Sequence, residues 1–354
     1  MSGDETDTPR DFEPFELQLY RFSPFGFRLT TFLIFVIAFG SALLIAWLTQ
    51  SPPPFAVNDE GMIHLTDVLW ITFVLSLILT TGFALNESGK RLWEGVGEDV
   101  LRAVTLDGEA TVRGFAGRVP ASWRGRYRLF ILLGFLIGGG LNIGIMLGEG
   151  IGFDRYVSSI GLWFLIFSGP LYAMGLRAGL DVARESSAIR RLIRQHVEVD
   201  LFHLERLTVF GTVGLRAAIS WLLMAGILLL FLVDARQAWI GLLAVFLAMC
   251  GGFWIFTSAV RPVHDKIRAA KGAELVRIHE RMATLREAAL AGDTDAAGAL
   301  AGLTDYEIWI EQRPEWPLSP SVTLRFALYV LIPVVPIAGA YLFEKLADQI
   351  LLGV

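Results

Sequence analysis

Seven long apolar stretches, separated by polar segments, dominate the hydrophobic pattern of this chain. Each has about the 20 residues that a helix needs to cross a hydrocarbon core of about 30 Å. Strands of membrane barrels are about half as long and alternate in polarity, so the pattern favours helices. The predicted fold class is all-α, a polytopic membrane bundle of about seven transmembrane helices. The predicted spans are residues 29–49, 66–85, 129–148, 156–176, 213–233, 237–258 and 324–343.

The basic residues between these spans predict the orientation. With the N-terminus inside, 27 of the 30 Lys and Arg residues fall in inner segments, and only Arg155, Arg236 and Lys345 lie outside. Enrichment of Lys and Arg on the cytoplasmic side sets membrane orientation. We therefore expect the N-terminus in the cytoplasm and the C-terminus on the far side. The excess of Arg over Lys indicates a GC-rich bacterial genome, and hence a bacterial inner membrane.

The same pattern predicts how the chain is divided. The inner segments hold most of the polar mass, whereas the outer loops are short, which excludes an extracellular ligand-binding domain. The fourth span is expected to continue inward as one helix, because apolar residues recur at helical spacing from Ile189 to Leu201. The predicted parts are a cytoplasmic tail with an interfacial segment at 1–28, a six-span bundle at 29–258 with inner loops 86–128 and 177–212, a cytoplasmic helical hairpin at 259–318, and the seventh span with a short external C-terminus at 319–354.

The hairpin carries the clearest repeat. Pro262 can open its first helix, because the first turn needs no N–H partner. An apolar seam then repeats at the 3-4 spacing of a short coiled coil, and it consists of Leu275, Ile278, Met282 and Leu285. Gly292 can end this helix, and Asp293, Thr294 or Asp295 can cap the second one. The seam can close on the hairpin itself or on another subunit, and the sequence leaves both open.

The spans contain few groups that could do chemistry. No Asp, Glu, Lys, Arg or His lies deep in any of them, which argues against a proton- or sodium-coupled transporter and against a voltage sensor. The third span instead carries glycines four residues apart, which permit close helix packing. Its candidate residues for packing, or for a backbone-lined pore wall, are Gly138, Gly140, Asn142 and Gly144. We expect Asn142 to be an interhelical hydrogen-bond donor rather than a ligand.

Prolines mark two further spans. Ser168 and Pro170 belong to a Ser-Gly-Pro sequence in the fourth span, and Pro333 and Pro336 lie in the seventh. Proline within a membrane helix frees carbonyl groups and bends the helix. Structural kinks are the favoured interpretation, and broken helices that form a transport site are the alternative.

Motifs for metal, nucleotide or nucleophilic chemistry are missing from the sequence. His196 and His203 would share a face if one helix carried both, but there is no HExxH motif and no second cluster, so a solvated helix is favoured over a zinc site. GxSxG and GxxxxGK[ST] are also absent. Cys250 is the single cysteine. We therefore expect no cofactor, no metal and no catalytic site.

Three functions stay open. The preferred hypothesis is a non-enzymatic membrane protein whose cytoplasmic hairpin mediates assembly, with membrane lipids, further copies of the chain or another membrane or cytoplasmic protein as partners, and no nucleic acid. The alternative is a passive ion or small-solute channel gated from the cytoplasmic side. A lipid-acting membrane enzyme that uses Arg177–Arg206 or the two histidines is the second alternative.

Overall fold

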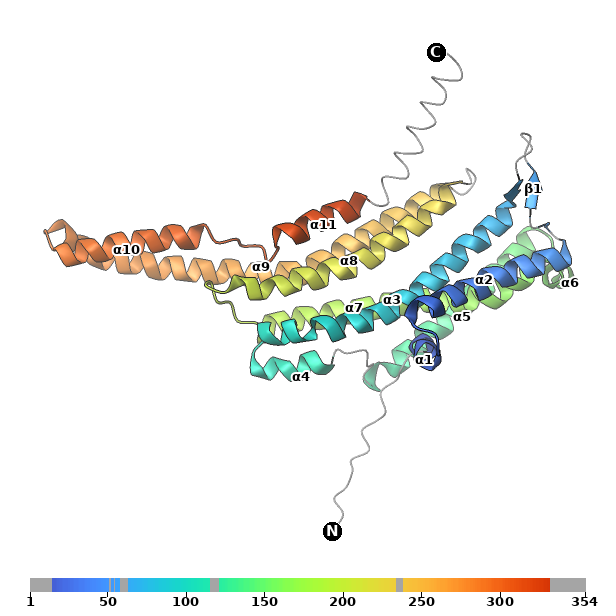
Figure 1. Ribbon diagram of the computed structural model, residues 1–354, viewed down its shortest axis with the longest axis horizontal. Coiled ribbons are helices and arrows are strands. Elements are labelled where there is room, and N and C mark those ends of the chain that lie inside the picture. Colours follow the sequence, from blue (N-terminus) through green and yellow to red (C-terminus); the bar gives the residue numbers. More distant parts are fainter. Residues whose placement is uncertain are drawn as a thin grey trace, which may run out of the picture.

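The computed structural model describes residues 15–50, 52–53, 55–57, 63–114, 121–233 and 238–331. Apart from one small β-ribbon, the regular structure in this part of the chain is helical, and the long helices run roughly along one axis (Figure 1). The ribbon pairs β1 with β2 in antiparallel register, Phe55 opposite Leu65. It lies in the segment between the first two predicted spans, and the sequence did not predict its strands. The elements are α1 (Phe15–Phe22), α2 (Phe27–Thr49), β1 (Phe55–Val57), β2 (Ile63–Leu65), α3 (Asp67–Ala103), α4 (Leu106–Gly114), η1 (Ala121–Trp123), α5 (Arg124–Gly148), α6 (Phe153–Val157), α7 (Gly161–His196), η2 (Leu204–Leu207), α8 (Thr208–Leu228), η3 (Leu229–Val233), α9 (Ala238–Leu290), α10 (Thr294–Glu311) and α11 (Pro320–Leu331).

Five helical segments of the described chain are long and apolar enough to cross a membrane, which gives the chain the make-up of an integral membrane protein. Of the two other predicted spans, the fourth begins in α6 and continues through the first half of α7, and only the beginning of the seventh, in α11, lies within the described residues. The count of seven therefore stays a prediction. The five segments are Phe27–Thr49, Asp67–Gly89, Arg124–Gly148, Leu204–Phe231 and Val245–Leu290.

The surface of these segments is rich in large apolar side chains. On α5, Leu136 and Ile143 are 61% and 58% exposed, and on α9 Phe246 and Trp254 are 63% and 64% exposed. A soluble monomer rarely exposes apolar patches of this extent. Such a surface is suited to contact with hydrocarbon rather than with water.

Three helices continue well beyond their apolar halves and meet in one large core. This core, which we call the shared core, draws buried residues from α3, α4, α7, α8, α9 and α10. The apolar series predicted in the inner segment after the fourth span lies within it, from Ile189 to Leu201. However, α7 ends at His196, so the last members of the series reach the core from the connection that follows the helix.

Pro262 does not begin a helix, contrary to the sequence-based expectation. It lies inside α9, which runs unbroken for 53 residues from Ala238 to Leu290. Proline removes one helical hydrogen bond and clashes with the preceding turn, but Val260 and Val263 beside it are only 1% and 0% exposed. Their burial holds the helix together across the proline, so the sixth predicted span and the first helix of the hairpin are one element.

The turn after α9 follows the capping chemistry predicted from the sequence. Gly292 has a φ of 95°, a conformation that favours glycine. The Asp293 side chain then accepts hydrogen bonds from the backbone N–H groups of Asp295 and Ala296 and caps α10. α10 returns along α9, and the pair extends past the ends of α3, α4 and α7 (Figure 1).

Candidate functional site

The most extensive helix–helix contact joins α5 to α7, and glycines make it possible. A Cβ atom on Gly134 would lie 2.2 Å from Cα of Ala173, and one on Gly138 would lie 2.7 Å from the backbone nitrogen of Gly169. Both positions therefore have space for hydrogen only. The two backbones approach as closely as the small-residue spacing of the third span permits.

A polar cluster bridges the same two helices. Asn142 is 2% exposed, and its Nδ2 atom donates to the hydroxyl oxygen of Ser168 at 2.6 Å and to the carbonyl oxygen of Gly138 at 2.7 Å. The hydroxyl of Tyr156, from α6, donates to Asn142 Oδ1 at 2.6 Å. We call Asn142, Tyr156 and Ser168 the clasp. Because both ends of the amide are engaged within the chain, the clasp is built to hold α5, α6 and α7 together.

The other glycines of the third span lie elsewhere. A Cβ atom on Gly140 or Gly144 would meet no atom within 4 Å, and both residues are exposed. The sequence had grouped them with Gly138 and Asn142, whereas the structure divides the set between a packed face and an open one. Pro170 is half-buried inside α7, and Pro333 and Pro336 lie outside the described residues.

A charged cluster joins the beginning of α5 to the middle of α7. The hydroxyl of Tyr127 donates a hydrogen bond to Asp181, and Arg184 lies 3.7 Å from that carboxylate. Arg177, one turn earlier on α7, is 4% exposed. Sequence reasoning missed this cluster, although the i, i+4 and i, i+3 spacing of Arg177, Asp181 and Arg184 was a signal for it.

The predicted seam of the hairpin packs within the chain. Ile278 is 3% exposed, and Leu275 and Met282 are half-buried against the same core as Leu303 and Tyr306 of α10. Leu285 is also half-buried. Within the chain, the seam therefore packs toward α10, and its closure on another subunit stays an open prediction.

Polar contacts line the hairpin beside the seam. Nζ of Lys271 donates to the carbonyl oxygen of Glu311 at 2.7 Å, and Nε2 of His279 lies 2.5 Å from a carboxylate oxygen of Glu307. The Tyr306 hydroxyl donates to Glu274. Partial burial and the nearby Glu274 carboxylate raise the pKa of Tyr306 above its ordinary value.

His196 and His203 do not share a helix face. α7 ends at His196, and His203 follows in a turn where its Nδ1 atom lies 2.7 Å from Oδ2 of Asp200. This contact is the main reason why the pKa of Asp200 is lowered. Within the described residues, no group of three or more His, Cys, Asp or Glu side chains is placed to hold a metal ion.

Comparison with known proteins gives no family for this chain. A scan against protein-family models finds no match, and searches of curated proteins and of solved structures find none either. The function is therefore inferred from the geometry of the chain itself.

Proposed function

We propose that this chain is a non-catalytic protein of a bacterial inner membrane, with a cytoplasmic N-terminus, that assembles with further copies of itself or with another protein through the helical hairpin of α9 and α10. The observation that carries the proposal is the placement of this hairpin. It stands clear of the bundle at one end of the molecule (Figure 1) and is continuous with a membrane-embedded helix.

The hairpin is firmly attached at its base. Val263 and Ile267 of α9 and Ile310 of α10 belong to the shared core, together with residues of α3, α7 and α8. Nζ of Lys266 also donates to the carbonyl oxygen of Val197, just past the end of α7, at 2.6 Å. A partner on the hairpin would therefore be held at a defined position relative to the membrane helices.

The hairpin also presents apolar side chains to solvent. Val276, Ile308 and Leu290 are 56%, 46% and 77% exposed. They lie outside the seam and so are free for contact with another molecule. The fully buried core of a protein–protein interface is more apolar than the rest of the surface, and these side chains would supply such positions.

The proposal is tested by the double variant Val276→Asp/Ile308→Asp, purified in detergent and sized by light scattering after gel filtration. The seam residues are unsuitable targets, because a charge there would unfold the hairpin. Leu106→Asp is the matched control, since Leu106 is 85% exposed on α4, away from the hairpin. We expect the double variant to lose the oligomer or the co-purifying partner and the control to keep it. An unchanged mass and partner set in the double variant would refute the proposed role.

A passive channel is the alternative that the sequence raised. Its polar wall would have included Asn142, but the clasp uses both ends of that side chain. At Gly140 and Gly144, on the open face, only backbone atoms could contact a solute. We therefore favour assembly over conduction, and solute flux through liposomes that contain the purified chain would reverse this preference.

A further inference from the structure

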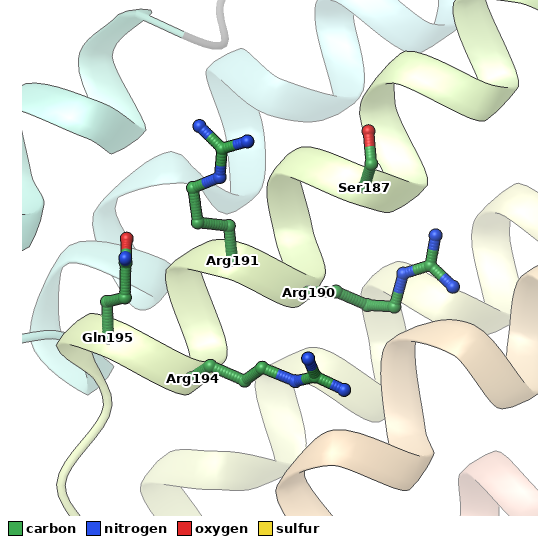
Figure 2. A pocket seen from close by; sticks show the side chains of 5 residues that line it. All are labelled: Ser187, Arg190, Arg191, Arg194 and Gln195. Carbon is green, nitrogen blue, oxygen red and sulfur yellow. The ribbon is translucent and has the colours of Figure 1, made fainter.

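One face of α7 carries a cluster of arginines around a surface hollow. The hollow has a volume of about 430 Å³ and is lined by Ser187, Arg190, Arg191, Arg194 and Gln195. Figure 2 shows that all five side chains come from α7, with Arg190 and Arg194 extending from one edge of this face and Ser187, Arg191 and Gln195 from the other edge. We infer that this hollow binds an anion with two or more phosphate groups.

The opposite face of the same turns is rigidly packed. Ile189, Leu192 and Ile193 belong to the shared core and are 7%, 1% and 0% exposed. The backbone that carries the arginines is therefore held in place. Binding then costs the ordering of the side chains alone.

The arginines lack acidic partners in the part of the chain that the structure describes. No ion pair there involves Arg190, Arg191 or Arg194, whereas Arg184 on the preceding turn pairs with Asp181. Arg190 and Arg194 are four residues apart, a spacing at which like charges repel. A multivalent anion would remove this repulsion.

Guanidinium groups are suited to phosphate. Each offers a planar fork of donors that binds two phosphate oxygens at once. The Ser187 hydroxyl and the Gln195 amide add neutral donors at the rim of the hollow. A volume of about 430 Å³ lies within the range of small-molecule sites, and it accommodates a diphosphate group.

The position along α7 favours a soluble phosphate over a lipid headgroup. Arg190 lies 14 residues past residue 176, where the fourth predicted span ends. At 1.5 Å per residue, this is about 21 Å of helix. The headgroup layer on each side of a bilayer is only about 5–8 Å thick. The inference does not depend on the proposed assembly role of the hairpin.

The test measures binding of inorganic pyrophosphate to the full chain by titration calorimetry. The variant is Arg190→Gln/Arg194→Gln, with Arg191→Gln as a second variant. The matched control is Arg281→Gln/Arg286→Gln, which removes two exposed arginines from α9. These side chains lie outside the buried core, so the substitutions should leave the fold intact. Unfolding midpoints of all variants that equal the midpoint of the original chain would establish this.

We expect pyrophosphate to bind the original chain in neutral-lipid nanodiscs. Removal of charged hydrogen bonds predicts a loss of about tenfold or more in affinity in the variant, and the control should retain its affinity. A second arm uses nanodiscs that contain phosphatidylglycerol. If this lipid competes with pyrophosphate, the phosphate that the hollow binds belongs to a lipid headgroup. Absence of pyrophosphate binding, an equal loss in the control, or equally tight binding of a polyglutamate peptide would overturn the inference.

Discussion

The close approach of α5 and α7 at Gly138 makes a sharp prediction for Gly138→Ala. The new Cβ atom would lie 2.7 Å from the backbone nitrogen of Gly169 and from the carbonyl carbon and oxygen of Ser168. These are backbone atoms within a helix, so they cannot turn aside as the end of a flexible side chain could. The helices must separate locally to admit the methyl group.

Two opposing free energies decide the outcome. Alanine is favoured over glycine in a helix by about 1 kcal/mol. Overpacking costs about 1–3 kcal/mol, and separation also stretches the 2.6 Å hydrogen bond from Asn142 to Ser168, which is worth about 0.6 kcal/mol in a membrane helix pair. We expect a net loss of about 1–2 kcal/mol in the free energy of unfolding.

Gly144→Ala is the matched control, because it is the same substitution in the same helix at a position with no atom within 4 Å of the new Cβ. It should be neutral or stabilising by up to about 1 kcal/mol. Unfolding is followed in mixed micelles with rising SDS fraction by the fluorescence of the ten tryptophans. Equal unfolding free energies for the two variants would refute the close-packed contact between α5 and α7.

Three further predictions concern the clasp, the cap of α10 and the orientation. Tyr156→Phe removes the donor to Asn142 Oδ1 and should cost about 1 kcal/mol in the same unfolding assay; no loss would mean that the amide finds another partner. Asp293→Ala removes the side-chain cap of α10 and should lower stability by about 1 kcal/mol, with faster hydrogen exchange confined to the first turn of α10 as the check. Ala291→Cys in a Cys250→Ser background should be labelled by an impermeant maleimide in inside-out vesicles and protected in right-side-out ones, and the reverse result would contradict the orientation predicted from the arginines.

The sequence was most informative where one physical cause dominates. Apolar length located the five described membrane-compatible segments, because nothing but burial in lipid or protein accommodates such helices. Periodicity also predicted that the fourth span continues as a helix, and in the structure Ile189, Leu192 and Ile193 of that helix belong to the shared core. A cap at Asp293, Thr294 or Asp295 was predicted because a capping oxygen and the free N–H groups that it binds lie within three residues, and the structure has Asp293 in this role.

Contacts between distant residues were beyond such reasoning. Asn142 was expected to bond to another helix, but nothing local identified Tyr156 or Ser168 as its partners, since these depend on how α6 and α7 meet α5. The indole nitrogen of Trp163 similarly donates to the carbonyl oxygen of Ala38 at 2.8 Å, across 125 positions in the chain. The division of the glycines between Gly138 and Gly144 also required the position of α7.

Pro262 shows most clearly how packing overrides a local rule. A proline inside a helix costs about 3 kcal/mol, which justifies a predicted boundary at that position. Full burial of an aliphatic side chain contributes about 1.5–3 kcal/mol, and Val260, Val263 and Ile267 are all at most 1% exposed. Their combined burial exceeds the cost of the proline, so α9 passes without interruption from its apolar half into the hairpin. A helix without a break transmits displacement along its axis, and a partner that moves the hairpin would therefore also move the part of α9 that packs against α8. An independently folded hairpin on a flexible linker would not be coupled to the membrane-compatible part of the bundle in this way.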